Sequence, residues 1–263
     1  MRIELVLSIG VACAILGMLW FLLTPSSREM TYKSLDSGEP LIAVIHEPPR
    51  FRRLRGTLVF FHGGGWYTGS PRGRVSALGR ALAAKGYRFV APQYRVYGRD
   101  RTGIEAGLQD ARDAVAWAQA QFAADRQDVF ALGGGSAGGH LAALVALDSE
   151  ASTISHLVLM NPVLDLTSAT PETGFSTGEL MLIGQLAPQR QRELSPLHRV
   201  AEFPMPVLAA YGDLDPLWSA YKKSLAETAL RTEVFAGESH GFFNQVSLRP
   251  SVVGLVQEFL DPR

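Results

Sequence analysis

A serine in a glycine-rich segment is the first candidate for chemistry. Residues 134–138 read Gly-Gly-Ser-Ala-Gly, which fits the pattern G-x-S-x-G with Ser136 at its centre. An apolar run precedes the segment, and an Ala- and Leu-rich run follows it from residue 139. A sharp strand-to-helix turn exposes a serine hydroxyl, and glycine neighbours let the two elements pack closely. We predict that Ser136 is a nucleophile for acyl transfer; the alternative is a capping serine in a glycine-rich turn.

A second glycine-rich segment offers backbone donors for the same chemistry. Residues 62–66 read His-Gly-Gly-Gly-Trp and follow an apolar run directly. Three consecutive glycines cost backbone entropy unless the backbone must approach something closely. Acyl transfer supplies such a need, because N–H donors must lie within about 3 Å of the developing oxyanion. We expect the N–H groups of Gly64, Gly65 and Ala137 to form this oxyanion hole; the alternative is that the glycines only permit a tight turn.

A nucleophilic serine also needs a histidine base and a carboxylate that orients it. Of the six histidines, His240 is favoured because Glu-Ser-His-Gly-Phe follows the last strand-like run. Asp213 and Asp215 both follow an apolar run at 207–211. We favour Asp215, because it precedes a proline and a residue before proline adopts an extended conformation. His62 is expected to orient its own loop by hydrogen bonding and not to act as the base.

These segments lie at the ends of runs that read as strands. From residue 30 onward the chain alternates such runs with helical periodicity, typical of a mostly parallel sheet with helices on both faces. Asp36-Ser37-Gly38 predicts a hairpin between the first two strands. We expect strands at residues 30–35, 41–46, 57–61, 88–93, 129–132, 157–160, 207–211 and 233–235.

Besides the helix expected after Ser136, three helices and one irregular insertion are predicted outside the sheet. Ser70-Pro71 predicts the start of a helix that ends near Gly86. Apolar residues recur every three or four positions from 104 to 122, which predicts the clearest helix. The region 162–204 breaks the alternation, with short helices expected around 178–186 and 188–194. An insertion after a strand is where such sheets place ligand-contacting elements, so we interpret it as a small lid. A last amphipathic helix is expected near the C-terminus.

The N-terminus differs from the rest of the chain. Residues 5–23 contain no charged side chain and are almost wholly apolar. About 19 residues at 1.5 Å each span roughly 28 Å, close to the hydrocarbon core of a bilayer. We expect residues 1–29 to be a single-pass transmembrane anchor and linker, with the catalytic domain, residues 30–263, outside the cytoplasm. A cleaved signal peptide is the alternative.

Composition excludes several function classes. The chain has 263 residues, enough for one large domain, and 25 basic residues balance 25 acidic ones. This balance gives no electrostatic footprint for nucleic acid. The single cysteine, Cys13, cannot form an intramolecular disulfide. No metal-ligand spacing, phosphate loop or dinucleotide fingerprint is present, so no cofactor is expected. A local basic cluster reads as a solvated turn or a contact with anionic lipid headgroups: Arg50, Arg52, Arg53 and Arg55.

Taken together, these motifs resemble the HGGG-type carboxylesterases, a group that includes hormone-sensitive-lipase-like esterases and BD-FAE-like α/β hydrolases. The resemblance covers about residues 57–245. It implies the α/β-hydrolase fold, with Ser136, Asp215 and His240 as the catalytic triad in the chain order of that fold. Ser195-Pro196-Leu197 also looks like the BD-FAE-like members. By contrast, Gly135 stands where hormone-sensitive-lipase-like enzymes usually carry an acidic residue.

The resemblance implies hydrolysis of small carboxylic esters with short to medium acyl groups, through an acyl-enzyme intermediate. Three alternatives remain open at this point. Kynurenine formamidases share a similar His-Gly-Gly-x-Trp segment, which allows amide or formamide hydrolysis. An acyltransferase with an acceptor other than water, or a non-catalytic interaction domain, would use the same fold, and fold analogy alone does not separate these functions.

Overall fold

The computed structural model of this chain describes residues 22–125, 129–149 and 153–261. Its centre is an eight-stranded sheet in the order β1-β2-β4-β3-β5-β6-β7-β8. β2 pairs antiparallel with both β1 and β4, and all other neighbours are parallel. The predicted mostly parallel sheet is therefore confirmed. Its strands are β1 (Ser26–Ser34), β2 (Pro40–Glu47), β3 (Gly56–Phe61), β4 (Tyr87–Pro92), β5 (Phe130–Gly135), β6 (His156–Met160), β7 (Val207–Gly212) and β8 (Arg231–Phe235).

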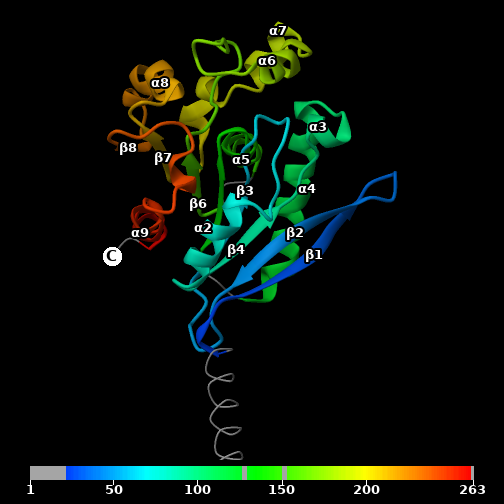
Figure 1. Cartoon of the computed structure of the whole chain (residues 1–263), viewed down its shortest axis with the longest axis vertical. Coiled ribbons are helices and arrows are strands. Elements are labelled where there is room, and N and C mark those ends of the chain that lie inside the picture. The colour runs from blue at the N-terminus through cyan, green and yellow to red at the C-terminus, as the bar shows by residue number, and fades with distance from the viewer. Residues whose placement is uncertain (1–21, 126–128, 150–152, 262–263) are drawn as a thin grey trace, which may run out of the picture.

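Helices cover both faces of the sheet, as predicted (Figure 1). They are α2 (Arg74–Ala83), α3 (Tyr97–Asp100), α4 (Ile104–Phe122), α5 (Ala137–Leu147), α6 (Thr177–Gly184), α7 (Pro188–Glu193), α8 (Pro216–Ala226) and α9 (Arg249–Leu260). Short 3₁₀ turns are η1 (Ala123–Asp125), η2 (Pro196–Glu202) and η3 (Phe242–Asn244). Successive strand residues face opposite sides, so Phe61 belongs to the core cluster that contains residues of α4, α5 and α8, while Phe60 belongs to the cluster that contains residues of α2 and α9.

The central strands are buried on both faces. Every residue of β3, β4 and β7 is buried, which explains why these strands show no regular alternation of apolar and polar residues. The edge strand β1 is mostly exposed and pairs antiparallel with β2. The loop between them contains Gly38 with a φ of +82°, so the predicted hairpin is confirmed.

The predicted start of the helix after β3 is wrong. Ser70 and Pro71 precede the helix, and α2 begins at Arg74 with Gly73 as its N-cap. The Ser70 carbonyl accepts a hydrogen bond from the Gly73 N–H, and the Ser70 hydroxyl accepts one from the Arg72 N–H. These two bonds close a separate turn, so Ser70 caps that turn and not the helix.

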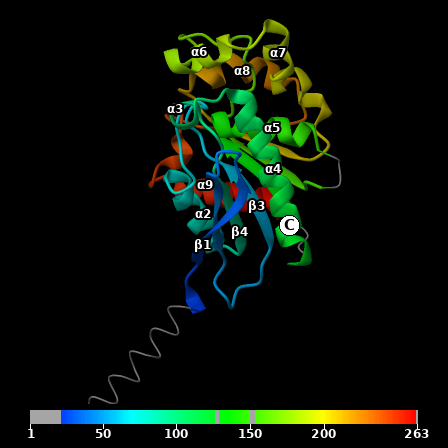
Figure 2. The same cartoon turned by 90° about the vertical axis from the view of Figure 1, so that its right-hand side faces the viewer.

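The insertion at 162–204 lies at the end of the domain where the parallel strands finish. It contains α6, α7 and η2, so the two predicted short helices are present. Figure 2 shows α6 and α7 beside α8 at the end opposite β1's first residues. Ser195 fastens the insertion internally, since its hydroxyl donates to the Gln191 carbonyl at 2.7 Å and accepts from the Leu166 N–H at 2.9 Å.

The predicted transmembrane segment, residues 5–23, lies almost wholly outside the described residues. Among the residues that the structure does describe, no helix is long and apolar enough to cross a membrane. β1 begins at Ser26, earlier than the expected strand start at residue 30. The Ser27 hydroxyl, 2.7 Å from His46 Nδ1, ties this first part of β1 to β2.

Candidate active site

Ser136 occupies a strained turn between β5 and α5. Its φ of +53° and ψ of −121° are uncommon for a residue with a side chain. The flanking glycines explain how the turn is held. A Cβ at Gly134 would lie 2.2 Å from the Gly138 carbonyl oxygen, and one at Gly138 would lie 2.3 Å from the Phe61 carbonyl oxygen. Only glycines allow β5, α5 and the end of β3 to approach this closely.

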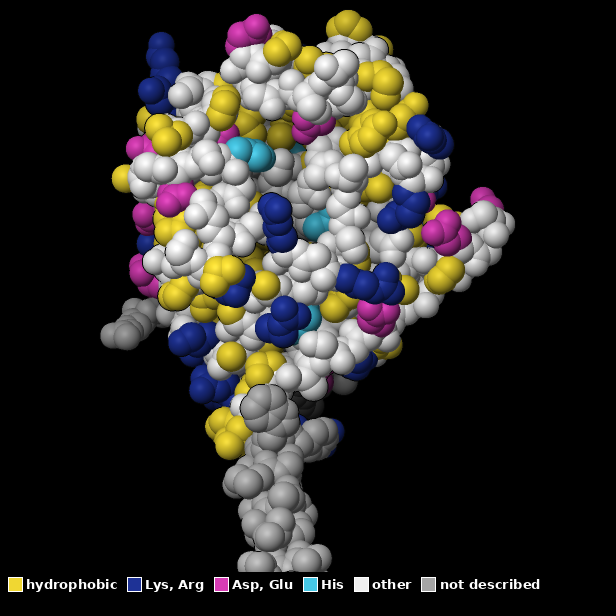
Figure 3. All heavy atoms as spheres, viewed as in Figure 1, with side chains coloured by type: hydrophobic (Ala, Val, Ile, Leu, Met, Phe, Trp, Pro, Cys, Tyr) yellow, Lys and Arg dark blue, Asp and Glu magenta, His cyan; other side chains and the backbone are white. Residues whose placement is uncertain are grey.

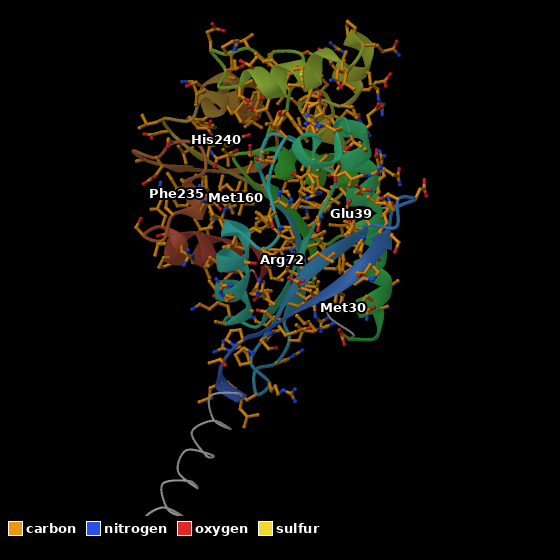
Figure 4. All side chains as sticks on the ribbon, turned by 45° about the vertical axis from the view of Figure 1, so that its right-hand side comes forward. Met30, Glu39, Arg72, Met160, Phe235 and His240 are labelled. Atoms are coloured by element: carbon orange, nitrogen blue, oxygen red, sulfur yellow. The ribbon has the colours of Figure 1, made fainter. Side chains whose placement is uncertain are left out.

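His240 connects Ser136 to Asp215. Its Nε2 lies 2.9 Å from Ser136 Oγ, and its Nδ1 lies 3.0 Å from Asp215 Oδ2. Because a carboxylate only accepts, Nδ1 carries the proton and Nε2 is left to accept the serine proton. His240 lies beyond Met160 and Phe235, the last residues of β6 and β8, toward the insertion (Figure 4). The three side chains predicted from the sequence are thus brought together.

The two candidate aspartates have different surroundings. Asp215 is 1% exposed and caps α8, with Oδ1 accepting from the Leu217 N–H at 3.0 Å. Asp213 is exposed, and its Oδ1 accepts from the Gly237 N–H at 2.7 Å. The structure therefore places Asp215, and not Asp213, against His240.

Asn161 is a site residue that the sequence analysis missed. It directly follows β6 with a φ of +47°, and its side-chain amide donates to Asp215 Oδ2, the oxygen that also faces His240. Its own N–H donates to the Ala210 carbonyl at 2.7 Å, which fixes its place beside β7. The sequence did offer a signal for Asn161, because it is a polar residue directly after a buried strand, at the edge of the sheet that carries Ser136.

The predicted oxyanion donors lie on two loops beside the serine. A Cβ at Gly63 would lie 3.3 Å from Ser136 Cβ, so the loop after β3 passes directly over the nucleophile. Gly64 and Gly65 have φ values of +125° and +61°, which glycine adopts readily. Among the described residues, the N–H groups of Gly64, Gly65 and Ala137 have no backbone acceptor. Their placement suits a hydrogen bond to a substrate oxygen, and their role in catalysis stays a prediction.

The buried side chains of His62 and Trp66 hold the loop after β3 in place. His62 is buried, stacks on Tyr94 at 4.3 Å and donates from Nδ1 to the Gly63 carbonyl at 2.8 Å. Burial lowers the pKa of His62 to about 4, so the ring is neutral at physiological pH. Trp66 is buried and packs edge-on against His140 at 5.1 Å. The prediction that His62 orients its own loop is confirmed.

A cleft of about 1000 Å³ opens over Ser136 and His240. Its walls are formed by the loop of residues 62–66, called the oxyanion loop from here on, by the start of α2 and by the segment around α6. Figure 3 shows the face hollowed in this upper part. Its charged lining includes Glu179 from α6 and Arg74 from α2. The cleft thus gives a small substrate access to the serine.

The arrangement has the parts that acyl transfer needs. A serine hydroxyl faces a histidine base, the base faces a buried carboxylate, and N–H donors without backbone acceptors lie beside the serine. Within the part of the chain that the structure describes, no group of three or more His, Cys, Asp or Glu side chains could hold a metal ion.

Curated relatives and solved structures are similar to this chain. It is 40% identical over 88 residues to the probable carboxylic ester hydrolase LipM of Mycobacterium tuberculosis, and 39% identical over 96 residues to esterase LipC of the same organism. These matches cover 32% and 35% of this chain but only 20% and 23% of the relatives. The chain thus spans less than a quarter of the length of these curated relatives.

The structural likeness extends over nearly the whole chain. Est2, an esterase of Thermogutta terrifontis solved with propionate bound, has 28% identity and a TM-score of 0.71, covering 90% of this chain and 96% of that chain. The butyrate-bound form of Est2 has 27% identity and a TM-score of 0.72 over the same shares. The family described as alpha/beta hydrolase fold matches residues 58–244, well over half of the sequence. The chain therefore belongs to the alpha/beta hydrolase fold family.

Proposed function

We propose that this protein is a serine carboxylesterase that hydrolyses esters with short to medium acyl groups. The observation that carries the proposal is the hydrogen-bonded series Ser136 Oγ, His240 and Asp215 beneath an open cleft. A non-catalytic interaction domain has no need for a strained serine in contact with a histidine. Strain of this kind costs on the order of 1–3 kcal/mol and persists where function requires it.

The geometry supports a two-step reaction. His240 Nε2 takes the hydroxyl proton as Ser136 Oγ attacks the ester carbonyl carbon. The N–H groups of Gly64, Gly65 and Ala137 hold the resulting oxyanion, and His240 then gives its proton to the departing alcohol. In the second step His240 takes a proton from water, which attacks the acyl-enzyme. The acid leaves, and the proton returns to Ser136.

An acyl-chain series tests both the reaction and its substrate class. The binding of propionate and butyrate by Est2 supports a preference for short acyl groups. We expect p-nitrophenyl acetate to hexanoate to be hydrolysed with the highest kcat/KM, and the laurate ester with a much lower value. N-formylkynurenine tests the formamidase alternative, and faster turnover of this amide than of every ester would overturn the proposal.

We also propose that residues 1–29 hold the protein at a membrane as a single-pass anchor, with the catalytic domain outside the cytoplasm. Residues 5–23 are uncharged and long enough for this role. The pairing of Ser26 with Glu47 places the loop after β2 at the end of the domain where the chain enters β1. Phe51 in this loop is 60% exposed beside exposed Arg52 and Arg53, and Lys and Arg side chains gather at this end in Figure 3. Arginine side chains beside an exposed apolar side chain suit contact with a membrane surface.

Carbonate washing and N-terminal sequencing test the anchor. The full chain should stay in the membrane pellet, and protease added outside intact cells should digest the catalytic domain. A soluble mature protein whose sequence starts near Ser26 would instead support the cleaved signal peptide.

A further inference from the structure

The insertion places a carboxylate against the oxyanion loop. Glu179, in the first turn of α6, lines the cleft. A Cβ at Gly65 would lie 2.4 Å from Glu179 Oε1, so the carboxylate packs on the Gly65 backbone. Gly65 is buried although it lies on a cleft wall, and this contact helps to account for its burial. A charged group from the insertion therefore lies beside an N–H group that we assign to the oxyanion hole.

The carboxylate is held by one oxygen and leaves the other available. Oε2 accepts from the Ser176 N–H at 2.8 Å and from the Ser176 hydroxyl at 2.6 Å, in a capping box at the start of α6. No hydrogen bond to Oε1 is present among the described residues, although Oε1 is the oxygen nearest to Gly65. Because the capping box already orders the side chain, a ligand that binds Oε1 does not have to order it.

The charge of Glu179 is also uncompensated nearby. Among the described residues no Lys, Arg or His nitrogen lies within 4.0 Å of its carboxylate. Arg74, the basic side chain that lines the cleft from α2, is exposed and forms no ion pair with it. A negative charge beside the oxyanion hole raises the energy of the anionic intermediate formed from a neutral ester. A positive charge on the substrate at this place would be attracted to Glu179 and would offset that repulsion.

We propose that Glu179 is a specificity-determining residue that selects esters carrying a cationic group. Oε1 attracts the cation, and the cation in turn screens the developing oxyanion from the carboxylate. This inference rests on the proposed esterase function. It predicts that neutral esters are accepted less well than cationic esters of the same shape.

Isosteric substrate pairs test the proposal on the full chain. Butyrylcholine and 3,3-dimethylbutyl butyrate differ by a quaternary nitrogen in place of a carbon on the alcohol side. The p-nitrophenyl esters of 4-(trimethylammonio)butanoate and 5,5-dimethylhexanoate differ in the same way on the acyl side. In at least one pair, wild-type kcat/KM should favour the cation by about tenfold, as expected for opposite charges near a protein surface.

Glu179→Gln removes the charge and keeps the capping box, because glutamine also serves in that motif. The cationic preference should fall about tenfold, through slower turnover of the cationic ester and faster turnover of the neutral one. Glu172→Gln is the matched control, since Glu172 is exposed in the same insertion and does not line the cleft. It changes net charge equally and should leave the preference intact.

Two results would overturn the proposal. The first is a cationic preference, measured as the kcat/KM ratio of the cationic to the neutral ester, that is the same in the wild type and in Glu179→Gln for both pairs. The second is a loss of this preference in Glu172→Gln as large as that in Glu179→Gln. Failure of the esterase function is distinguishable, since then the wild type would hydrolyse neither member of either pair.

Discussion

The two sides of the cleft are built in different ways. On one side the Ser136 turn and the loop of Gly64 are held by backbone contacts so close that only glycine fits. On the other side the insertion is held by side-chain hydrogen bonds, such as those of Ser176 and Ser195, and many of its residues are exposed. Close backbone contacts thus fix the position of the reacting atoms, whereas the side chains of the insertion form the surroundings of the substrate. Substitutions on the first side should therefore lower kcat for every substrate, whereas those on the second should change the ratio between substrates.

The largest effect is expected from Asp215→Asn. An amide cannot hold His240 in the tautomer that leaves Nε2 free, so kcat should fall by on the order of 10³–10⁴. Asp213→Asn is the matched control, because the Asp213 carboxylate is exposed and accepts from the Gly237 N–H instead of facing His240, so the change should alter kcat by no more than a few-fold. Ester hydrolysis by the two purified variants, with thermal unfolding to confirm folding, decides the point. A greater loss in Asp213→Asn would exchange the two roles.

A smaller loss is expected when a side chain is added to the oxyanion loop. A Cβ at Gly64 would lie 2.2 Å from the Thr68 carbonyl oxygen, and the φ of +125° is unfavourable for alanine. Gly64→Ala should displace an N–H donor and lower kcat by on the order of 10²–10³, with KM changed only a few-fold. Gly65→Val should act in the same direction, although its side chain would first displace Glu179.

Gly184→Ala supplies the comparison from the other side of the cleft. Gly184 ends α6 and has no neighbour within 4 Å of a Cβ, so alanine should leave kcat unchanged and not lower the melting temperature. If Gly64→Ala instead lowers the melting temperature while the folded protein keeps its kcat, the glycines serve only a tight turn. Measuring kcat and thermal stability on the same samples separates the two interpretations.

The smallest effect concerns two buried histidines, His62 in the loop after β3 and His140 in α5. Burial lowers the pKa of both His62 and His140 from 6.5 to about 4. The unfolded chain therefore binds protons more readily than the folded one. Their contribution to stability is complete above about pH 6.5 and is lost as the pH falls toward 4.

Urea unfolding between pH 8 and pH 4 measures this effect. His140 Nε2 donates to the Leu194 carbonyl at 2.7 Å and so fastens the insertion to α5. His140→Asn should be less stable at pH 8 and lose less stability on acidification than the wild type. An unchanged slope in this variant would show that other groups cause the acid sensitivity.

The glycine-dependent side of the site was predictable from the sequence. Close backbone contacts at the turn demand glycine at 134 and 138, on either side of Ser136, so the spacing of these residues identifies the turn. The strands were predictable for a similar reason, because residues buried on both faces must be apolar throughout. His240 and Asp215 followed from their positions after the last two strands and from the chemistry that a serine requires.

The remaining features depend on contacts between segments distant in sequence. Asn161 reaches Asp215 and Glu179 reaches Gly65 only because the folded sheet brings their elements together. The start of α2 was predicted wrongly, because Ser70 and Pro71 fit a helix start but close a separate turn. Side-chain hydrogen bonds of this kind leave no periodicity in the sequence.

Covalent labelling tests the central claim, that Ser136 is a nucleophile activated by His240. The full chain would be incubated with a fluorophosphonate, digested, and mapped by mass spectrometry, beside Ser136→Ala treated in the same way. We expect one stoichiometric adduct on the peptide that contains Ser136, and no adduct in Ser136→Ala. Labelling that persists in Ser136→Ala, or that maps to another residue in the wild type, would contradict it.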